Sequence, residues 1–231
     1  MNIKAYLERI NYHGLLAPTA ETLRDLQVAH LLAVPFENLS IHARQPIILE
    51  DEALFTKIVE RRRGGFCYEA NGLFAALLRA LGFDVAMLSA EVARADGGFG
   101  PDFDHMALMV TLEERWLVDV GFGDSFLEPL RLDERGEQVQ GGRAYRILPD
   151  GPYLVLMRGA MVESGRLSIV LPCSRMSTPI MQRCAATTRL PRSRISRKPA
   201  SVRGRQREGA LHSARCVLSQ PLRTARGKSE P

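Results

Sequence analysis

The chain has 231 residues, a formal net charge of +5 and 45% hydrophobic residues, which suffices for one or two globular domains with a sizeable core. Its first residues lack the charged start and apolar block of a signal peptide, and no apolar run reaches the roughly 18 residues of a spanning helix. These features predict a cytoplasmic protein with reduced thiols and no membrane association.

The cysteines do not form a metal-binding or disulfide pattern. None of the four lies in a CxxC pair, so neither a zinc site nor a thioredoxin motif is indicated and we expect no metal. They are Cys67, Cys173, Cys184 and Cys216.

Charge is divided unevenly along the chain. Residues 1–150 carry 15 Lys and Arg against 23 Asp and Glu, whereas residues 151–231 carry 16 Lys and Arg against 3 Glu. Tyr153 is the last aromatic residue of the sequence. Such an asymmetry predicts two segments of different character.

Apolar residues recur at helical spacing in the first 82 residues. Thr19 and Asp51 are suitable N-caps for the second and third predicted helices, and Gly82 is a suitable stop after the fourth. We therefore predict a helical domain over residues 1–82. The predicted helices span residues 3–10, 20–34, 52–60 and 67–81.

After Gly82 the pattern changes from helical to strand-like. Two of the runs are separated by Glu113 and Glu114, which fits a hairpin. Several strands after several helices predict an α+β fold, and not an alternating α/β fold. The predicted strands span residues 83–93, 105–112, 115–120, 144–148, 153–158 and 166–171.

The stretch RRRGGFCYEANG, residues 61–72, places one cysteine between a glycine pair and the start of the fourth predicted helix. At a helix N-terminus the unpaired N–H groups and the helix dipole favour a thiolate. Cys67 is therefore a candidate nucleophile. The alternative is a small buried side chain that only packs.

His105 and Asp119 are candidates for the partners of Cys67. They lie near the start of one arm and the end of the other arm of the predicted hairpin, although the register that decides their facing cannot be read from the sequence. A thiol, an imidazole and a carboxylate supply a nucleophile, a base and a group that orients the base. Individually, His105 could face solvent and Asp119 could form a turn.

Four strings resemble the arylamine N-acetyltransferases, in that family's order and approximate spacing. They are VPFENLS from Val34, RRRGGFCYEANGLF from Arg61, DHMALMV from Asp104 and RWLVDVGFGD from Arg115. The resemblance covers about residues 1–150, and its RGGFCYE-N and VDVGFG elements are specific to that family.

The resemblance implies roles for five residues. Cys67 matches the acetyl-accepting nucleophile, His105 and Asp119 match the rest of the catalytic triad, and Phe36 and Phe122 match residues that line the acceptor pocket. It also implies acetyl-CoA as donor co-substrate and an arylamine or arylhydrazine as acceptor, with no nucleic acid as partner. The implied fold is a helical domain, a β-barrel domain and a C-terminal α/β lid, in the papain-like cysteine enzyme superfamily.

The chain departs from the family after about residue 158. We expect a helical domain over residues 1–82, a β-barrel domain over 83–158 and a basic segment over 159–231 in place of the lid. That segment has three interpretations: a basic arm that binds nucleic acid or membranes, an evolved disordered tail, or an out-of-frame translation of the third domain. The simultaneous loss of aromatic residues, Asn and Asp favours the last.

The predicted function is acetyl transfer from acetyl-CoA to an arylamine or arylhydrazine through an acetyl-cysteine, impaired if the segment after 158 does not complete the donor site. One alternative is a cysteine peptidase or transglutaminase-like enzyme with the same triad. Another is a non-catalytic binding protein with an acidic body and a basic arm.

Overall fold

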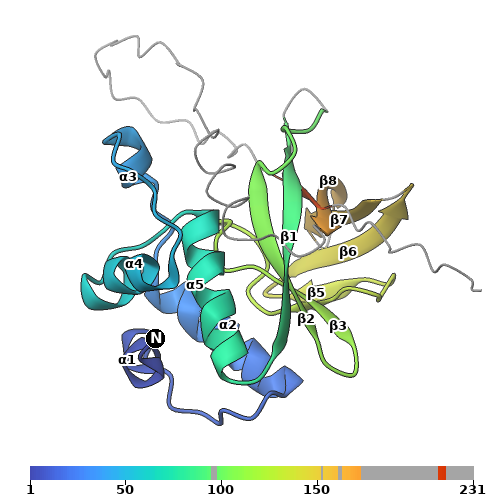
Figure 1. Ribbon diagram of the computed structural model, residues 1–231. Coiled ribbons are helices and arrows are strands. Elements are labelled where there is room, and N and C mark those ends of the chain that lie inside the picture. Colours follow the sequence, from blue (N-terminus) through green and yellow to red (C-terminus); the bar gives the residue numbers. More distant parts are fainter. Residues whose placement is uncertain (95–97, 152, 161–162, 173–212, 217–231) are drawn as a thin grey trace, which may run out of the picture.

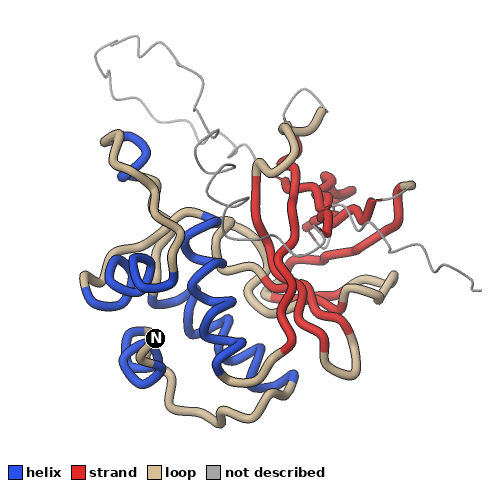
Figure 2. Tube along the Cα trace, viewed as in Figure 1, coloured by secondary structure: helices blue, strands red, loops and turns tan. Residues whose placement is uncertain are grey.

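The computed structural model describes residues 1–94, 98–151, 153–160, 163–172 and 213–216. Its helices gather on one side and its strands on the other (Figures 1 and 2), so the α+β prediction is confirmed. The last helix ends at Ala80 and the first strand begins at Asp84. Among these residues no helix combines the length and apolarity that a membrane crossing requires.

The helical part matches the predicted pattern with two differences. Thr19 caps the second helix, because its Oγ1 accepts a hydrogen bond of 3.2 Å from the Thr22 N–H. The predicted cap at Asp51 is wrong: Glu50 is the N-cap and Asp51 is already helical. A short unpredicted helix also follows the VPFEN loop. The helices are α1 (Ile3–Arg9), α2 (Ala20–Ala33), α3 (Leu39–His42), α4 (Asp51–Phe55), a π-helical turn (Thr56–Glu60) and α5 (Cys67–Ala80).

Helix α5 is the centre of the fold and lies between the other helices and the sheet (Figure 1). Leu73, Phe74, Leu77 and Leu78 are completely buried and belong to one core with the inner face of the first strands. A helix buried on most of its surface is held by packing rather than by propensity. Its N-terminal residue, Cys67, is therefore fixed against the sheet.

The strands form one antiparallel sheet. Its order is β4-β3-β2-β1-β8-β9-β7-β6-β5, and β1 and β2 pair with Ala90 opposite His105. The strands are β1 (Asp84–Ala93), β2 (His105–Thr111), β3 (Arg115–Val118), β4 (Leu130–Arg131), β5 (Gln138–Gln140), β6 (Arg143–Asp150), β7 (Tyr153–Ala160), β8 (Glu163–Pro172) and β9 (Ser213–Cys216).

The predicted closed barrel is not found, because backbone pairing among the described residues leaves β4 and β5 as edges. Two side-chain amides join these edges instead. Gln138 accepts from the Arg131 N–H at 2.8 Å and donates to its carbonyl at 2.9 Å. Gln140 does the same with Glu128, at 2.9 and 2.7 Å. Each amide thus occupies the backbone groups that a closing ladder would use.

Only part of the basic segment over 159–231 belongs to the described residues. The predicted strand at 166–171 is present within β8, and β9 lies further along the chain. The rest of the basic segment, residues 161–162, 173–212 and 217–231, lies outside the described residues.

Candidate active site

The β2–β3 hairpin brings His105 and Asp119 together. Leu108 of β2 stands opposite Val118 of β3, and Asp119 follows directly after β3. His105 Nε2 lies 2.7 Å from Asp119 Oδ2, and the two residues are only 4% and 5% exposed. The register that the sequence left open therefore turns both side chains inward, toward each other.

Cys67 completes the group from the first residue of α5. It is 7% exposed, and its interaction with His105 is one of the causes that raise the pKa of the ring. Because Nε2 of the ring is bonded to Asp119, Nδ1 is the nitrogen left for the Cys67 sulfur. The sulfur, the imidazole and the carboxylate thus belong to one buried group.

The charge state of the ring follows from its neighbours. Burial lowers the pKa of His105. The charges of Asp119 and Cys67 and the hydrogen bonds attributed to both act in the opposite direction and outweigh burial, so the pKa rises from its ordinary 6.5 to about 10. The ring is therefore an imidazolium at neutral pH, which is the partner that a thiolate needs. The protonated ring stabilises the fold fully below pH 6.5, its ordinary pKa, and this contribution is lost as the pH rises through about 10.

Asp119 is held from its second oxygen by two donors. Oδ1 accepts 2.9 Å from Asn71 Nδ2 and 2.8 Å from the Gly121 N–H. The same Asn71 side chain donates to the Met106 carbonyl at 2.7 Å and accepts from the Val120 N–H at 2.9 Å. The carboxylate therefore cannot turn away from His105 without breaking several buried hydrogen bonds.

A buried ion pair fixes the start of α5. Lys57 Nζ lies 2.7 Å from both carboxylate oxygens of Glu69, which is 3% exposed. Glu69 also accepts 3.2 Å from the Phe66 N–H, the residue before Cys67. Lys57 belongs to the π-helical turn that follows α4.

The VPFEN loop is tied to the glycine pair before Cys67. Glu37 forms an ion pair with Arg63 and accepts from the Gly64 N–H at 3.1 Å, and its own N–H donates to the Gly65 carbonyl at 3.0 Å. A Cβ on Gly64 would meet the Pro35 carbonyl oxygen at 2.0 Å, so glycine is required for this approach.

Two aromatic side chains border the triad. The Phe122 ring meets the His105 ring edge to face, with centroids 5.1 Å apart. Phe36 is 50% exposed and lies beside Gly123, where an added Cβ would be 3.8 Å from its ring. The two predicted acceptor-pocket residues thus come from different loops, and Phe36 lies next to the turn that contains Phe122.

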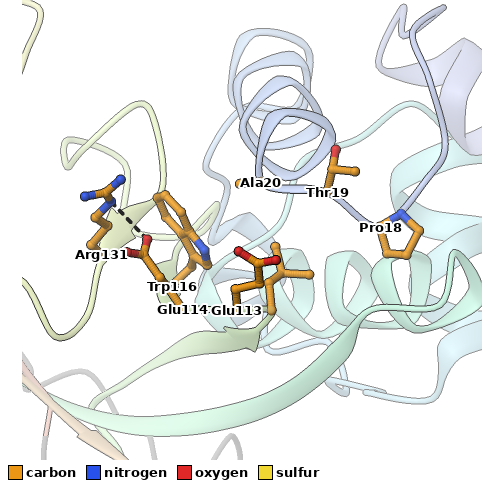
Figure 3. A pocket seen from close by; sticks show the side chains of 8 residues that line it. Pro18, Thr19, Ala20, Glu113, Glu114, Trp116 and Arg131 are labelled. Atoms are coloured by element: carbon orange, nitrogen blue, oxygen red, sulfur yellow. Dashed lines mark ion pairs between the residues drawn. The ribbon is translucent and has the colours of Figure 1, made fainter.

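A separate cavity of about 570 Å³ lies between the start of α2 and the β2–β3 hairpin (Figure 3). Arg131 pairs with Glu114 there, with Nε and Oε2 3.0 Å apart, and stacks over the Trp116 ring at 5.8 Å. None of the predicted site residues lines it. Its lining residues are Pro18, Thr19, Ala20, Leu112, Glu113, Glu114, Trp116 and Arg131.

Sequence reasoning missed Asn71, Gly121 and the Lys57–Glu69 pair. A signal existed for Asn71, because it lies four residues after Cys67 and therefore on the same face of the helix. No comparable signal marks Lys57, which belongs to the π-helical turn. No group of three or more His, Cys, Asp or Glu side chains in the described part of the chain is arranged to hold a metal ion.

A buried thiol at a helix start, beside an imidazole that a carboxylate holds, has the chemical components of a site with a cysteine nucleophile. The sequence model of the N-acetyltransferase family matches residues 19–161. The chain belongs to the arylamine N-acetyltransferase family.

Individual relatives agree with this assignment. The arylamine N-acetyltransferase / N-hydroxyarylamine O-acetyltransferase of Salmonella typhimurium is 40% identical over 156 residues, which are 67% of this chain and 56% of that protein. A solved structure of the Salmonella typhimurium enzyme matches 79% of this chain and 67% of its own, with 33% identity and a TM-score of 0.72.

The Mycobacterium marinum enzyme in complex with CoA is also similar, at 40% identity and a TM-score of 0.67, over 72% of this chain and 64% of its own. The chain spans just over half the length of the curated relatives it matches.

Proposed function

We propose that the chain transfers an acetyl group from acetyl-CoA to the amino group of an arylamine or arylhydrazine, by a ping-pong mechanism through an acetyl-cysteine at Cys67. The observation that carries the proposal is the buried His105 ring, bonded to Asp119 and with its pKa raised by Asp119 and Cys67, in a chain of this family. The roles of the triad are part of the proposal.

In the first half-reaction the Cys67 thiolate attacks the thioester carbonyl carbon of acetyl-CoA. The new carbon–sulfur bond forms, the carbonyl oxygen takes the negative charge, and the N–H at the start of α5 stabilises it, because the first N–H groups of a helix have no intrahelical acceptor. The bond to the CoA sulfur then breaks. The His105 imidazolium supplies the proton with which CoA leaves as a thiol.

In the second half-reaction the amine nitrogen attacks the acetyl-cysteine carbonyl, and His105, now neutral, takes a proton from the nitrogen. Collapse of the tetrahedral intermediate releases the acetylated amine and regenerates the thiolate beside the imidazolium. Arylamines suit this step because they are unprotonated at neutral pH. The aromatic rings of Phe36 and Phe122 offer flat apolar walls for such an acceptor.

The proposal divides the chain into three parts. Residues 1–82 supply the nucleophile, residues 83–158 supply His105 and Asp119 on a barrel-like sheet, and residues 159–231 stand where the family has its lid. In the family the lid supplies contacts with the non-reacting part of CoA, and such contacts position the reacting carbonyl. We propose that residues 159–231 do not replace these contacts, so that acetyl-CoA is bound less well than in an intact relative.

Initial-rate kinetics test the proposal. We measure CoA release at several fixed concentrations of an arylamine while acetyl-CoA is varied, and we expect parallel double-reciprocal lines, as for a ping-pong mechanism. Intersecting lines would replace it with direct transfer. Cys67→Ala is the control and must show no release above background.

A donor comparison separates the rival functions. We expect p-nitrophenyl acetate to acetylate Cys67 in a single turnover, and acetyl-CoA to do so less efficiently than in an intact relative. Cleavage of peptides without CoA, together with no acetylation by acetyl-CoA, would favour the peptidase alternative. A protein that reacts with neither and binds nucleic acid in a salt-sensitive manner would favour the binding alternative.

A further inference from the structure

Asn71 occupies a position between all three parts of the triad. It stands one helical turn after Cys67 on α5, and its side chain reaches the residue next to His105 and the two residues that follow β3. It is completely buried. An apolar side chain at this position would leave the Met106 carbonyl and the Val120 N–H without their Asn71 partners, and Asp119 Oδ1 with one donor fewer.

The hydrogen bonds of Asn71 have a fixed direction. Both hydrogens of Nδ2 are used, one for the Met106 carbonyl at 2.7 Å and one for Asp119 Oδ1 at 2.9 Å. Oδ1 accepts from the Val120 N–H at 2.9 Å. A buried donor or acceptor without a partner is costly, so this network specifies one arrangement of helix, strand and loop.

Gly121 closes the same arrangement from the other side. A Cβ there would lie 2.6 Å from the Cys67 Cα and 2.9 Å from Asn71 Nδ2. Its N–H donates to the same Asp119 oxygen that Asn71 holds. Helix and loop are thus in contact at the point where Asn71 joins them.

We propose that Asn71 is a positioning residue of the site: it donates to Asp119 and to the strand that carries His105, and so fixes the carboxylate against the ring that activates Cys67. The relevance of this positioning role to acetyl transfer rests on the proposed function. The chemistry it controls is the nucleophilicity of Cys67, which is measured without acetyl-CoA.

The informative variant is Asn71→Asp, which keeps the size of the side chain and the oxygen that accepts from Val120. The introduced oxygen faces two acceptors, the Met106 carbonyl and Asp119 Oδ1. A protonated carboxyl can donate to one of them, whereas an ionised one repels Asp119. The variant should therefore work partly at acid pH and fail as the pH rises.

The titratable groups around this position are Asp119, His105 and Cys67, with Asp104 next to His105 along the chain. The pKa of Asp104 is raised by its partial burial. Each of these groups is also present in the unmodified protein, whose pH profile is the reference. A change of the Cys67 alkylation rate with pH that is seen only in Asn71→Asp is therefore caused by the introduced carboxyl.

The experiment is the rate of Cys67 alkylation by iodoacetamide between about pH 5.5 and 8.5, divided by the folded fraction at each pH. We expect Asn71→Ala to be slower by about 10²-fold, the effect of a misplacement of about 1 Å. Asn71→Asp should fall relative to the unmodified protein by at least about tenfold between the acid and alkaline ends, because the introduced carboxyl ionises there.

Leu78→Ala is the matched control, a completely buried truncation about three turns after Cys67 in the same helix. It should lower the melting temperature and leave the shape of the pH profile unchanged. If Asn71→Asp does not fold, Asn71→Ala decides the question alone. An alkylation rate for the folded Asn71→Ala equal to that of Leu78→Ala would overturn the proposal, as would an Asn71→Asp profile parallel to the reference. Loss of acetyl transfer with these alkylation results intact would instead refute only the proposed function.

Discussion

His105→Ala is expected to slow the acetylation of Cys67 by p-nitrophenyl acetate by on the order of 10³-fold or more, because it removes the group that keeps the sulfur ionised and exchanges its proton. The pH dependence should change with it. In the unmodified protein the ring stays protonated up to its pKa of about 10, so the rate should be nearly independent of pH around neutrality. In the variant the rate should rise with pH, as for an unassisted thiol.

Asp119→Asn should also lose most of the rate, since its amide cannot stabilise the imidazolium as the carboxylate does. The two losses should not add in the double variant, because the residues act as a unit. The measurement is burst kinetics with p-nitrophenyl acetate for both single variants and the double variant. His42→Ala, a change at an exposed histidine, is the matched control and should react normally. Additive losses, or an unaffected Asp119→Asn, would refute the triad.

Gly121→Ala is expected to slow the alkylation of Cys67 and to lower the stability of the fold. The added Cβ would lie 2.6 Å from the Cys67 Cα, which is a backbone atom that cannot swing aside. The start of α5 and the loop after Asp119 must therefore separate. A misplacement of about 1 Å can cost about 10²-fold in rate, and overpacking of this kind costs about 1–3 kcal/mol of stability.

Gly136→Ala is its control. The nearest atom to a Cβ there is Glu134 Oε1 at 3.0 Å, the end of a flexible side chain. Both variants are compared by urea unfolding and by the alkylation rate of Cys67. We expect Gly136→Ala to match the unmodified protein in both. If Gly121→Ala keeps the full alkylation rate, close contact between helix and loop does not set the geometry of the site.

The positions of the triad followed from the sequence, whereas the geometry did not. Cys67 could be placed at a helix start because the glycine pair and the apolar stripe are local signals. The facing of His105 and Asp119 depends on a strand register, which a one-residue slip would reverse. Asn71 was visible only as a polar residue one turn after Cys67. Its hydrogen-bond partners Met106, Asp119 and Val120 lie 35 to 49 residues further along the sequence, so no local pattern reveals them.

The departures from prediction have a similar cause. Asp51 has the right chemistry for a cap, but the helix starts one residue earlier, which local propensity does not decide. The resemblance implied a β-barrel domain, but backbone pairing among the described residues does not close the sheet. The side-chain amides of Gln138 and Gln140 bind the backbone N–H groups of Arg131 and Glu128 instead. A hydrophobic pattern does not predict that side chains will take the place of strand pairing.

The central claim is that Cys67 carries the acetyl group. The direct measurement is peptide mapping by mass spectrometry after the full chain has reacted with acetyl-CoA or p-nitrophenyl acetate, before and after addition of an arylamine. We predict acetyl on the Cys67 peptide alone, and its loss to the amine in equal amount. Acetyl on Cys173, Cys184 or Cys216 at the same rate, or acetylated amine formed while Cys67 stays unmodified and Cys67→Ala stays active, would contradict the account.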